Sequence, residues 1–217
     1  MATKAELESQ REEYHFYLVQ ARDFLSQGAF LQALDTAIQS FDVIDAMMQF
    51  ERKYEKRQFD RIEAIDIVLR YAPILFHTTS LEALNNLLKN QKRIDKNADA
   101  DLAADLRCAY EKMWIAHALW EHLERSPSVP LGELSAKTQD QRQARAILNE
   151  WVRMGLVDVT GATQETFVRL ATNLLERVPA ICSLCGVHIQ GTKYKLLESR
   201  DCPGCHRPST FVLIAAQ

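Results

Sequence analysis

Residues 182–205 read CSLCGVHIQGTKYKLLESRDCPGC and contain four of the five cysteines of the chain. These form two Cys-x-x-Cys pairs, Cys182 with Cys185 and Cys202 with Cys205, and sixteen residues separate the pairs. Two residues between paired cysteines let the backbone turn tightly, so that both thiolates point at one ion. Two such pairs complete a tetrahedral shell of four sulfurs. The spacing therefore predicts one bound metal ion, with zinc as the expected metal.

The four-cysteine set also bears on the role of the metal. Four thiolates leave no open coordination position for water, so the predicted site is structural rather than hydrolytic. A single iron ion, as in rubredoxin, would fit the same ligands and would give a redox protein, which is the chemical alternative. His188 and His206 lie near the pairs, but four cysteines already suffice, and both are expected to be bystanders.

The residues around the cysteine pairs predict a small β domain. Residues 187–189 and 193–197 are predicted to be two short strands joined at 190–192, and residues 210–214 a third strand. With its cysteine spacing, the segment 179–217 resembles a zinc ribbon. In so small a domain the metal must contribute much of the folding free energy, about ten kcal/mol in zinc-finger peptides.

A second domain is expected at 111–178. Within it the chain changes character after Leu123, because Ser126-Pro127-Ser128-Val129-Pro130 cannot continue a helix. A helix precedes this segment; a short helix at 132–137 and a third helix at 140–154 follow, the latter capped by Gly155. Two alternating stretches then flank a tip at 160–166, and the return strand is expected at 167–170. This order resembles the winged-helix family.

The third helix is predicted to be amphipathic at 100° per residue. Its apolar stripe consists of Ala144, Ile147, Leu148, Trp151 and Val152. The opposite face carries Arg142, Arg145, Asn149 and Arg153. The winged-helix resemblance implies that such a face lies in the major groove of DNA, where Arg pairs with guanine and Asn with adenine. Lys193, Lys195 and Arg207 of the ribbon join this set as candidate nucleic-acid contacts.

Two observations keep a second interpretation open. The expected tip at 160–166 has no Lys or Arg to hold phosphates, which counts against tight DNA binding. Winged helices also serve as protein-interaction modules, and helical repeats followed by a winged helix resemble scaffold subunits of large assemblies. Contact with protein and contact with nucleic acid therefore both remain open for this region.

Helical periodicity dominates residues 1–110. A first amphipathic helix runs to Leu25, Gln27-Gly28 interrupts it, and one longer helix is expected from Phe30 to Met48, giving a helical hairpin. The second helix resembles half of a tetratricopeptide repeat, but no second copy follows at the expected period, so an ordinary packed hairpin is the alternative. Further helices are predicted from Ile62 to near Pro73, at 80–90 and at 99–124.

Catalytic motifs are missing from the sequence. It has no phosphate-binding Gly-rich loop, no nucleophile elbow and no His-Glu-x-x-His helix. His77, His117 and His122 occur singly in helical contexts, and Cys108 is expected to be a small core residue. Three tryptophans are expected to pack in the core or between domains: Trp114, Trp120 and Trp151. The chain is therefore expected not to be an enzyme, and no small-molecule substrate is evident.

Composition sets the broad class. Of the 217 residues, 47% are hydrophobic, as in chains that bury a core. The net charge is −3, but residues 137–217 carry 10 Lys and Arg against 7 Asp and Glu, so a polyanion would meet the C-terminal part. No apolar stretch is long enough to span a membrane. The clustered cysteines favour a reducing compartment, and the expected location is the cytoplasm.

These observations predict a mainly α protein with small β elements. Its expected parts are a helical bundle or repeat-like region at 1–110, a winged-helix-like domain at 111–178 and a zinc ribbon at 179–217. The predicted function is a non-enzymatic intracellular adaptor or regulatory protein with one structural zinc ion that contacts DNA or RNA. The alternatives are a scaffold that binds proteins, with a partner on the helical region, and a rubredoxin-like iron protein.

Overall fold

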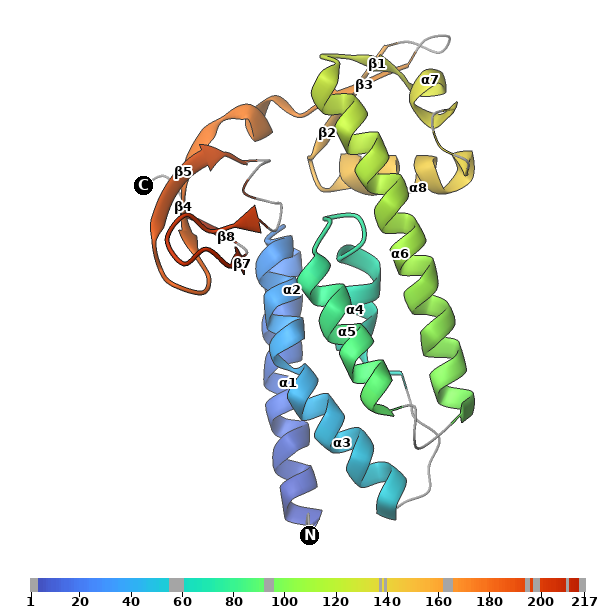
Figure 1. The fold of residues 1–217 in the computed structure, drawn as a ribbon, viewed down its shortest axis with the longest axis vertical. Coiled ribbons are helices and arrows are strands. Elements are labelled where there is room, and N and C mark those ends of the chain that lie inside the picture. Colours follow the sequence, from blue (N-terminus) through green and yellow to red (C-terminus); the bar gives the residue numbers. More distant parts are fainter. Residues whose placement is uncertain are drawn as a thin grey trace. The chain divides into compact units, whose positions relative to one another are not determined.

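The computed structural model describes residues 4–54, 61–91, 96–136, 138, 140–161, 166–193, 196, 200–209 and 211–214. Helices dominate these residues, and two three-stranded antiparallel sheets and one two-stranded sheet accompany them (Figure 1). The prediction of a mainly α protein with small β elements is confirmed. Among the described residues, no helix combines the length and the apolar character that a membrane span requires.

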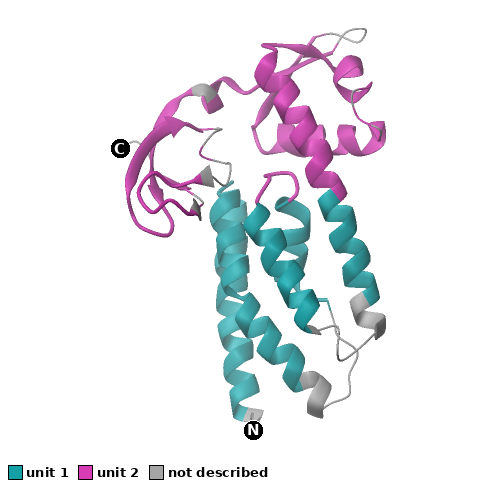
Figure 2. Ribbon diagram, viewed as in Figure 1, with its two compact units in different colours: residues 1–72, 78–110 teal, residues 73–77, 111–217 magenta. Residues whose placement is uncertain are grey.

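The chain forms two compact units (Figure 2). Unit 1 comprises residues 1–72 and 78–110, and unit 2 comprises residues 73–77 and 111–217. The short segment 73–77 therefore belongs to unit 2, although both of its neighbours along the chain belong to unit 1. The predicted division into three domains stays a prediction.

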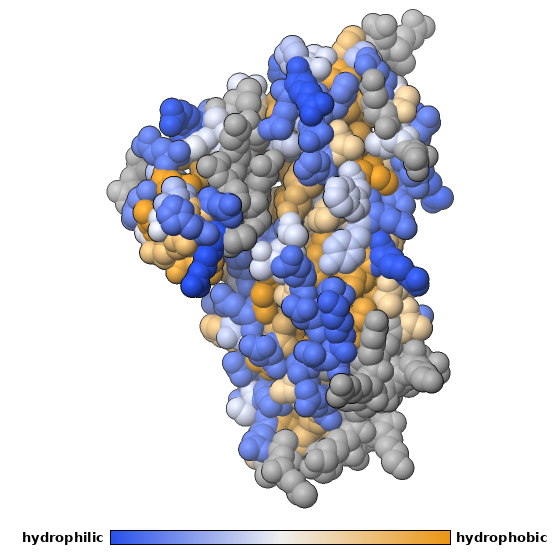
Figure 3. All heavy atoms as spheres, in the orientation of Figure 1, coloured by the Kyte–Doolittle hydropathy of each residue, from blue (hydrophilic) through white to orange (hydrophobic). Residues whose placement is uncertain are grey.

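Unit 1 is helical, and its face in Figure 3 mixes hydrophilic with hydrophobic residues. Its helices are α1 (Lys4–Ser26), α2 (Phe30–Gln39), α3 (Phe41–Tyr54), α4 (Glu63–Tyr71), α5 (Thr78–Gln91) and the first part of α6 (Lys96–Arg125). Helix α1 packs against α2 and α3, and α2 also contacts α4 and α5. The core contains the fully buried side chains of Leu34, Ile44, Ile65, Leu81 and Leu84.

The hairpin between α1 and α2 turns where the sequence predicts it. Gly28 has a positive φ of 71°, and its N–H donates to the carbonyl of Leu25. The N–H of Ala29 reaches back to the carbonyl of Phe24, which completes a Schellman motif. The prediction of one continuous helix from Phe30 to Met48 is wrong, because α2 ends at Gln39 and α3 begins at Phe41.

Ser40 stands at the break between α2 and α3. Its hydroxyl is buried and donates a 2.7 Å hydrogen bond to the carbonyl of Ala37. A serine side chain that bonds to a nearby backbone carbonyl offers the chain an alternative to the regular helical ladder. The apolar periodicity of the sequence continues through Ser40. For that reason it predicts one helix rather than two.

Ion pairs and a tyrosine hold the start of α4 within unit 1. Arg22 of α1 donates two hydrogen bonds to the Glu63 carboxylate, at 2.9 and 2.6 Å, and these lower the pKa of Glu63. The Tyr14 hydroxyl accepts a bond from the N–H of Ala64. Arg61 pairs with Asp66 and with Asp105 of α6. Because these ion pairs are about half exposed, each contributes at most about 1 kcal/mol.

Unit 2 contains the second part of α6, β1 (Val129–Pro130), α7 (Leu131–Ala136), α8 (Gln141–Arg153), β2 (Val157–Thr160), β3 (Phe167–Leu170) and a 3-10 turn, η1 (Thr172–Leu175). The three strands form an antiparallel sheet in the order β1-β3-β2. Val168 pairs with Val129 on one side and with Val159 on the other. Residues 162–165 of the expected tip lie outside the described residues.

Helix α8 has the predicted C-terminal cap at Gly155 and most of the predicted core face. The Asp140 carboxylate accepts from the N–H of Gln143 at the start. Gly155, with φ 67°, ends the helix, and its N–H donates to the carbonyl of Val152. The buried face consists of Ala144, Ile147, Leu148 and Trp151. Val152 is 43% exposed, so its assignment to the core is wrong; it lies about 100° around the helix from Trp151.

The segment 73–77 joins an aromatic cluster in unit 2. The rings of Trp120 and Trp151 meet edge to face with centroids 5.2 Å apart, and the Phe76 ring lies 5.9 and 6.1 Å from them. The indole N–H of Trp151 donates to the carbonyl of Ile74. The packing role predicted for these two tryptophans is confirmed. The same prediction is wrong for Trp114, which is 68% exposed.

The C-terminal part of unit 2 is built on β4 (Arg177–Cys182), β5 (His188–Thr192) and β8 (Phe211–Leu213) in the order β5-β4-β8. We use the name ribbon for this part, residues 177–214. The strands β6 (Arg200–Asp201) and β7 (Pro208–Ser209) pair separately. The strand predicted at 210–214 is confirmed over the range of β8.

The first two predicted ribbon strands are partly wrong. Strand β5 continues through the expected turn at 190–192, because Gly191 and Thr192 pair with Val178 and Arg177 of β4. Lys193 and Leu196, the described residues of the expected second strand, are helical.

Candidate metal centre

The two cysteine pairs lie in loops with the same backbone hydrogen bonds. In the first loop the Cys182 N–H donates to the carbonyl of Val187, and the Cys182 carbonyl accepts from the N–H of Gly186, both at 3.0 Å. In the second loop the Cys202 N–H donates to the carbonyl of Arg207 at 3.0 Å, and its carbonyl accepts from the N–H of His206 at 2.8 Å. We call residues 182–187 and 202–207 knuckle 1 and knuckle 2.

Each knuckle has one residue in the left-handed region, directly after its second cysteine. This is Gly186 in knuckle 1, with φ 70°, and His206 in knuckle 2, with φ 54°. Glycine adopts this conformation at no steric cost, whereas a residue with a Cβ is strained there by about 1–2 kcal/mol. Knuckle 2 therefore carries backbone strain that knuckle 1 avoids.

We expect Gly186→Ala and His206→Gly to change ribbon stability in opposite directions. A Cβ at Gly186 meets no atom within 4 Å, so only the backbone strain is added, about 1 kcal/mol. His206→Gly removes a similar strain. Competition with a chelator should show metal held roughly fivefold more weakly by Gly186→Ala and roughly fivefold more tightly by His206→Gly.

Gly132→Ala is the control for these two variants. Its Cβ also meets no atom within 4 Å, and its φ is not positive, so metal retention should not fall. Two knuckle variants that shift metal retention in the same direction would contradict the backbone explanation.

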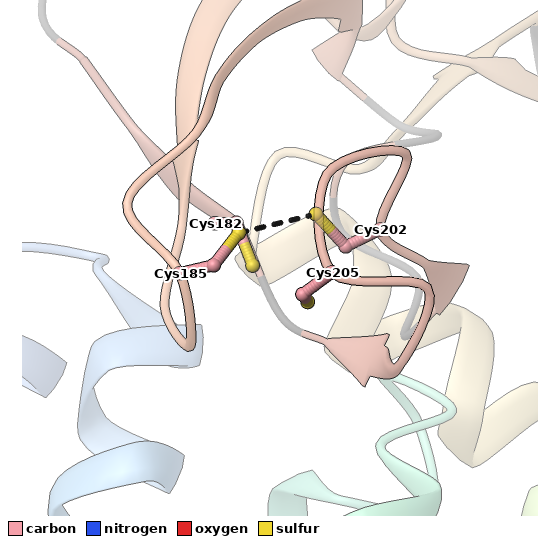
Figure 4. A group of neighbouring side chains, drawn as sticks. All are labelled: Cys182, Cys185, Cys202 and Cys205. Carbon is pink, nitrogen blue, oxygen red and sulfur yellow. Dashed lines mark hydrogen bonds between the residues drawn. The ribbon is translucent and has the colours of Figure 1, made fainter.

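The four cysteine sulfurs converge from the two knuckles, as Figure 4 shows. All four lie within 4.8 Å of one another, and those of Cys185 and Cys202 are 3.6 Å apart. Sulfurs bound at about 2.3 Å around a tetrahedral zinc ion lie about 3.8 Å from one another. A disulfide would require about 2.05 Å, and all five cysteines are free thiols. These four cysteines could hold a metal ion, and their spacing is compatible with one structural zinc.

The sulfur cluster is part of the small core of the ribbon. Cys182 and Cys202 are buried, and they pack with Ala180, Leu196 and Phe211. The knuckles also touch each other, since a Cβ at Gly204 of knuckle 2 would lie 2.8 Å from a methyl carbon of Val187 in knuckle 1. Apart from the cysteines, the described core of this part of unit 2 is small.

Hydrogen bonds around the cluster move the pKa values of Cys182 and Cys185 in opposite directions. Burial raises the pKa of the Cys182 thiol, but bonds from the Ser209 hydroxyl and the Cys185 backbone outweigh it and lower the pKa to about 6. A backbone bond from Val187 lowers the pKa of the Cys185 thiol, but desolvation and the neighbouring cysteine thiols raise it to about 12. Thiolate is the form that binds metal, and the donors at Cys182 orient and stabilise it there.

The other candidate site residues fall in two places. Arg142, Arg145, Asn149 and Arg153 are all exposed on the outer face of α8. Arg153 pairs with Glu150 at 3.0 Å, whereas Arg142 and Arg145 form no ion pair with any described residue. On the ribbon, Arg207 is exposed and Lys193 is half-buried. Lys195 lies outside the described residues.

Two features beside the cysteine cluster were not predicted. His206 is expected to be a bystander as a ligand, and its contribution is a backbone one, the conformation that Gly186 has in knuckle 1. Aligning the two Cys-x-x-Cys pairs with the residue that follows each would have revealed this equivalence. Ser209 acts through its hydroxyl, and no local pattern in the sequence marks it. Comparison of the chain with protein-family models, curated proteins and solved structures found no match.

Proposed function

We propose that this protein is a non-enzymatic adaptor or regulatory protein of the cytoplasm whose unit 2 joins a winged helix to a structural zinc ribbon and contacts nucleic acid. The observation that carries the proposal is the exposed, basic outer face of α8. The cysteine cluster supports zinc as the resident metal, since four sulfurs at this spacing suit a tetrahedral ion and leave no open position.

The metal content and the colour of the purified protein distinguish zinc from iron. Protein purified without added metal should contain about one zinc per chain by mass spectrometry and should be colourless. A visible absorption band with one iron per chain would favour the rubredoxin-like alternative and would remove the structural zinc from the proposal.

The element order supports the winged-helix assignment. Helix α6 is followed by β1, α7, α8 and the β2–β3 pair, with the sheet order β1-β3-β2. In nucleic-acid-binding winged helices the third helix presents its outer face to the major groove. Here that helix is α8, and its inner face is fixed by the buried Trp151 and Ile147. The outer face is therefore held in place by the core of unit 2.

The outer face of α8 has the chemistry for such contacts. Arg142, Arg145 and Asn149 recur at three- and four-residue intervals, so their side chains neighbour one another. Two arginines without an ion-pair partner among the described residues are available for phosphates or guanine edges. Glu150 neutralises Arg153, and Asp158 likewise pairs with Arg169 on the β2–β3 pair. The expected contact is therefore centred on the first half of α8.

We expect the double substitution Arg142→Ala and Arg145→Ala to weaken nucleic-acid binding. Each lost phosphate contact reduces the slope of log K against log salt by about 0.9 on duplex DNA, so the slope should fall by up to about 2. Filter-binding titrations with duplex DNA and with single-stranded RNA at several salt concentrations measure this slope.

A charge-matched control separates this face from net charge. Arg107→Ala with Arg125→Ala removes two exposed arginines of α6 and should leave the slope unchanged. Equal losses in both double variants would mean that the contact is not made by α8. Absence of binding by the unsubstituted protein at low salt would remove nucleic acid from the proposal.

A protein-interaction scaffold is the second candidate, and α1 favours it. Phe16 is 58% exposed and Val19 is 41% exposed, and these positions are neighbours on the helix surface. A partner protein on the helical region would cover both. Capture of a partner that survives nuclease and high salt but is lost in Phe16→Ser with Val19→Ser would favour this function.

A further inference from the structure

A pocket of about 490 Å³ opens within unit 2 between α6 and the start of α8. Glu111, Trp114 and Ile115 line it from α6. Thr138, Asp140 and Gln143 line it from the other side. Its volume falls in the range of pockets that hold small ligands or one side chain of a partner.

Trp114 gives the pocket an aromatic wall. Its side chain is 68% exposed, whereas Trp120 and Trp151 of the same unit are 5% and 0% exposed. Ile115 continues the apolar surface of the pocket. An exposed indole ring offers a π face to a planar or charged group that enters from solvent.

The polar atoms of the pocket are mostly hydrogen-bond acceptors. The Thr138 hydroxyl already donates, at 3.0 Å to the carbonyl of Ser135 and at 3.3 Å to that of Asp140. The Glu111 carboxylate forms no ion pair with the residues that the structure describes.

This arrangement selects for positive charge. The Glu111 carboxylate repels an anion, and so does the Asp140 carboxylate, which also accepts from the backbone N–H of Gln143. A guanidinium supplies several N–H donors in one plane, pairs with a carboxylate and stacks on an aromatic ring. An ammonium group supplies charge and hydrogen-bond donors, but it has no planar surface that can stack on the ring.

We propose that this pocket binds an organic cation, with a guanidinium group stacked on the Trp114 ring and paired with the Glu111 carboxylate. The cation is the side chain of an arginine in a partner polypeptide or a free small molecule of the same chemistry. The pocket does not use the basic outer face of α8, so the proposal stands independently of nucleic-acid binding.

The test uses the full ¹⁵N-labelled chain and the indole N–H resonance of Trp114, which Trp114→Phe identifies by its disappearance. N-acetylarginine methylamide should shift this resonance saturably at millimolar concentration, as expected for one exposed cation–π contact with an ion pair. N-acetylcitrulline methylamide has nearly the same shape without the charge and should cause no saturable shift. An equal response to citrulline would overturn the proposal.

Two carboxylate variants sharpen the test. Glu111→Gln should weaken arginine binding by about fivefold or more, since it removes the charge that pairs with the guanidinium. Glu124→Gln, an exposed glutamate further along α6, should leave it unchanged. Equal affinities in all three proteins would also overturn the proposal. A peptide with one arginine that binds more tightly than the amide identifies a polypeptide source, and equal affinity identifies a small molecule.

Discussion

Cys202→Ser is expected to release the metal and unfold the ribbon, residues 177–214, while unit 1 stays folded. Cys202 is fully buried at the centre of the small ribbon core, and serine is a poor replacement for a thiolate ligand. Metal binding contributes about 10–16 kcal/mol in zinc-finger peptides, more than this core can replace. Mass spectrometry of the purified protein should find well under one metal per chain. The dispersed amide resonances of β4, β5 and β8 should disappear.

Cys108→Ser is the matched control, because Cys108 lies on α6 outside the sulfur cluster. It should keep one metal per chain and the β resonances of the ribbon. A Cys202→Ser protein that retains both would show that the ribbon folds without its four-sulfur site. Treatment of the unsubstituted protein with a chelator should reproduce the Cys202→Ser spectrum, which links the unfolding to the metal rather than to the substitution.

The cysteine cluster could be predicted because the four ligands lie in two short motifs. The strands around it could not be predicted as well, for identifiable reasons. Strand β4 is central in its sheet yet contains Pro179, and proline argues against a central strand because it cannot donate to the ladder. Gly191 suggests a turn, but it lies within β5, where a Cβ would approach Leu196 to 3.2 Å.

Among the helices, too, features with a local sequence signal could be predicted, and features that depend on packing could not. The faces of α8 follow from its own period and caps, and only Val152 at the edge of the stripe is misplaced. Trp114 and Trp120 are six residues apart on α6 and lie about 120° apart around the helix axis, more than the width of a core stripe of about 100°. Helical geometry would therefore have separated them, but only the fold shows which one is buried.

The place of segment 73–77 depends on a contact that no local pattern reports. Ile74 and Trp151 meet through a hydrogen bond across 77 positions of the chain. Phe76 adopts a φ of 56°, which is strained for an aromatic residue and is maintained by the surrounding structure. Periodicity up to Tyr71 predicts only where α4 ends, so the role of the segment in unit 2 is a finding of the structure.

Trp151→Ala is expected to destabilise unit 2 by about 3–5 kcal/mol, because a fully buried indole is removed from the cluster with Trp120 and Phe76. Trp151→Phe keeps most of the packing and loses the hydrogen bond to the carbonyl of Ile74, so a smaller loss of about 1–3 kcal/mol is expected. Urea denaturation followed by circular dichroism measures both.

Trp114→Ala removes the same side chain from an exposed position and should change stability by no more than about 0.5 kcal/mol. The ranking of the three variants by loss of stability separates the effect of burial from that of residue type, because Trp151→Ala and Trp114→Ala remove the same kind of side chain. If Trp151→Ala and Trp114→Ala were equally stable, the aromatic cluster would not hold segment 73–77 in unit 2. If Trp151→Phe matched Trp151→Ala, the hydrogen bond to Ile74 rather than ring packing would fix that segment.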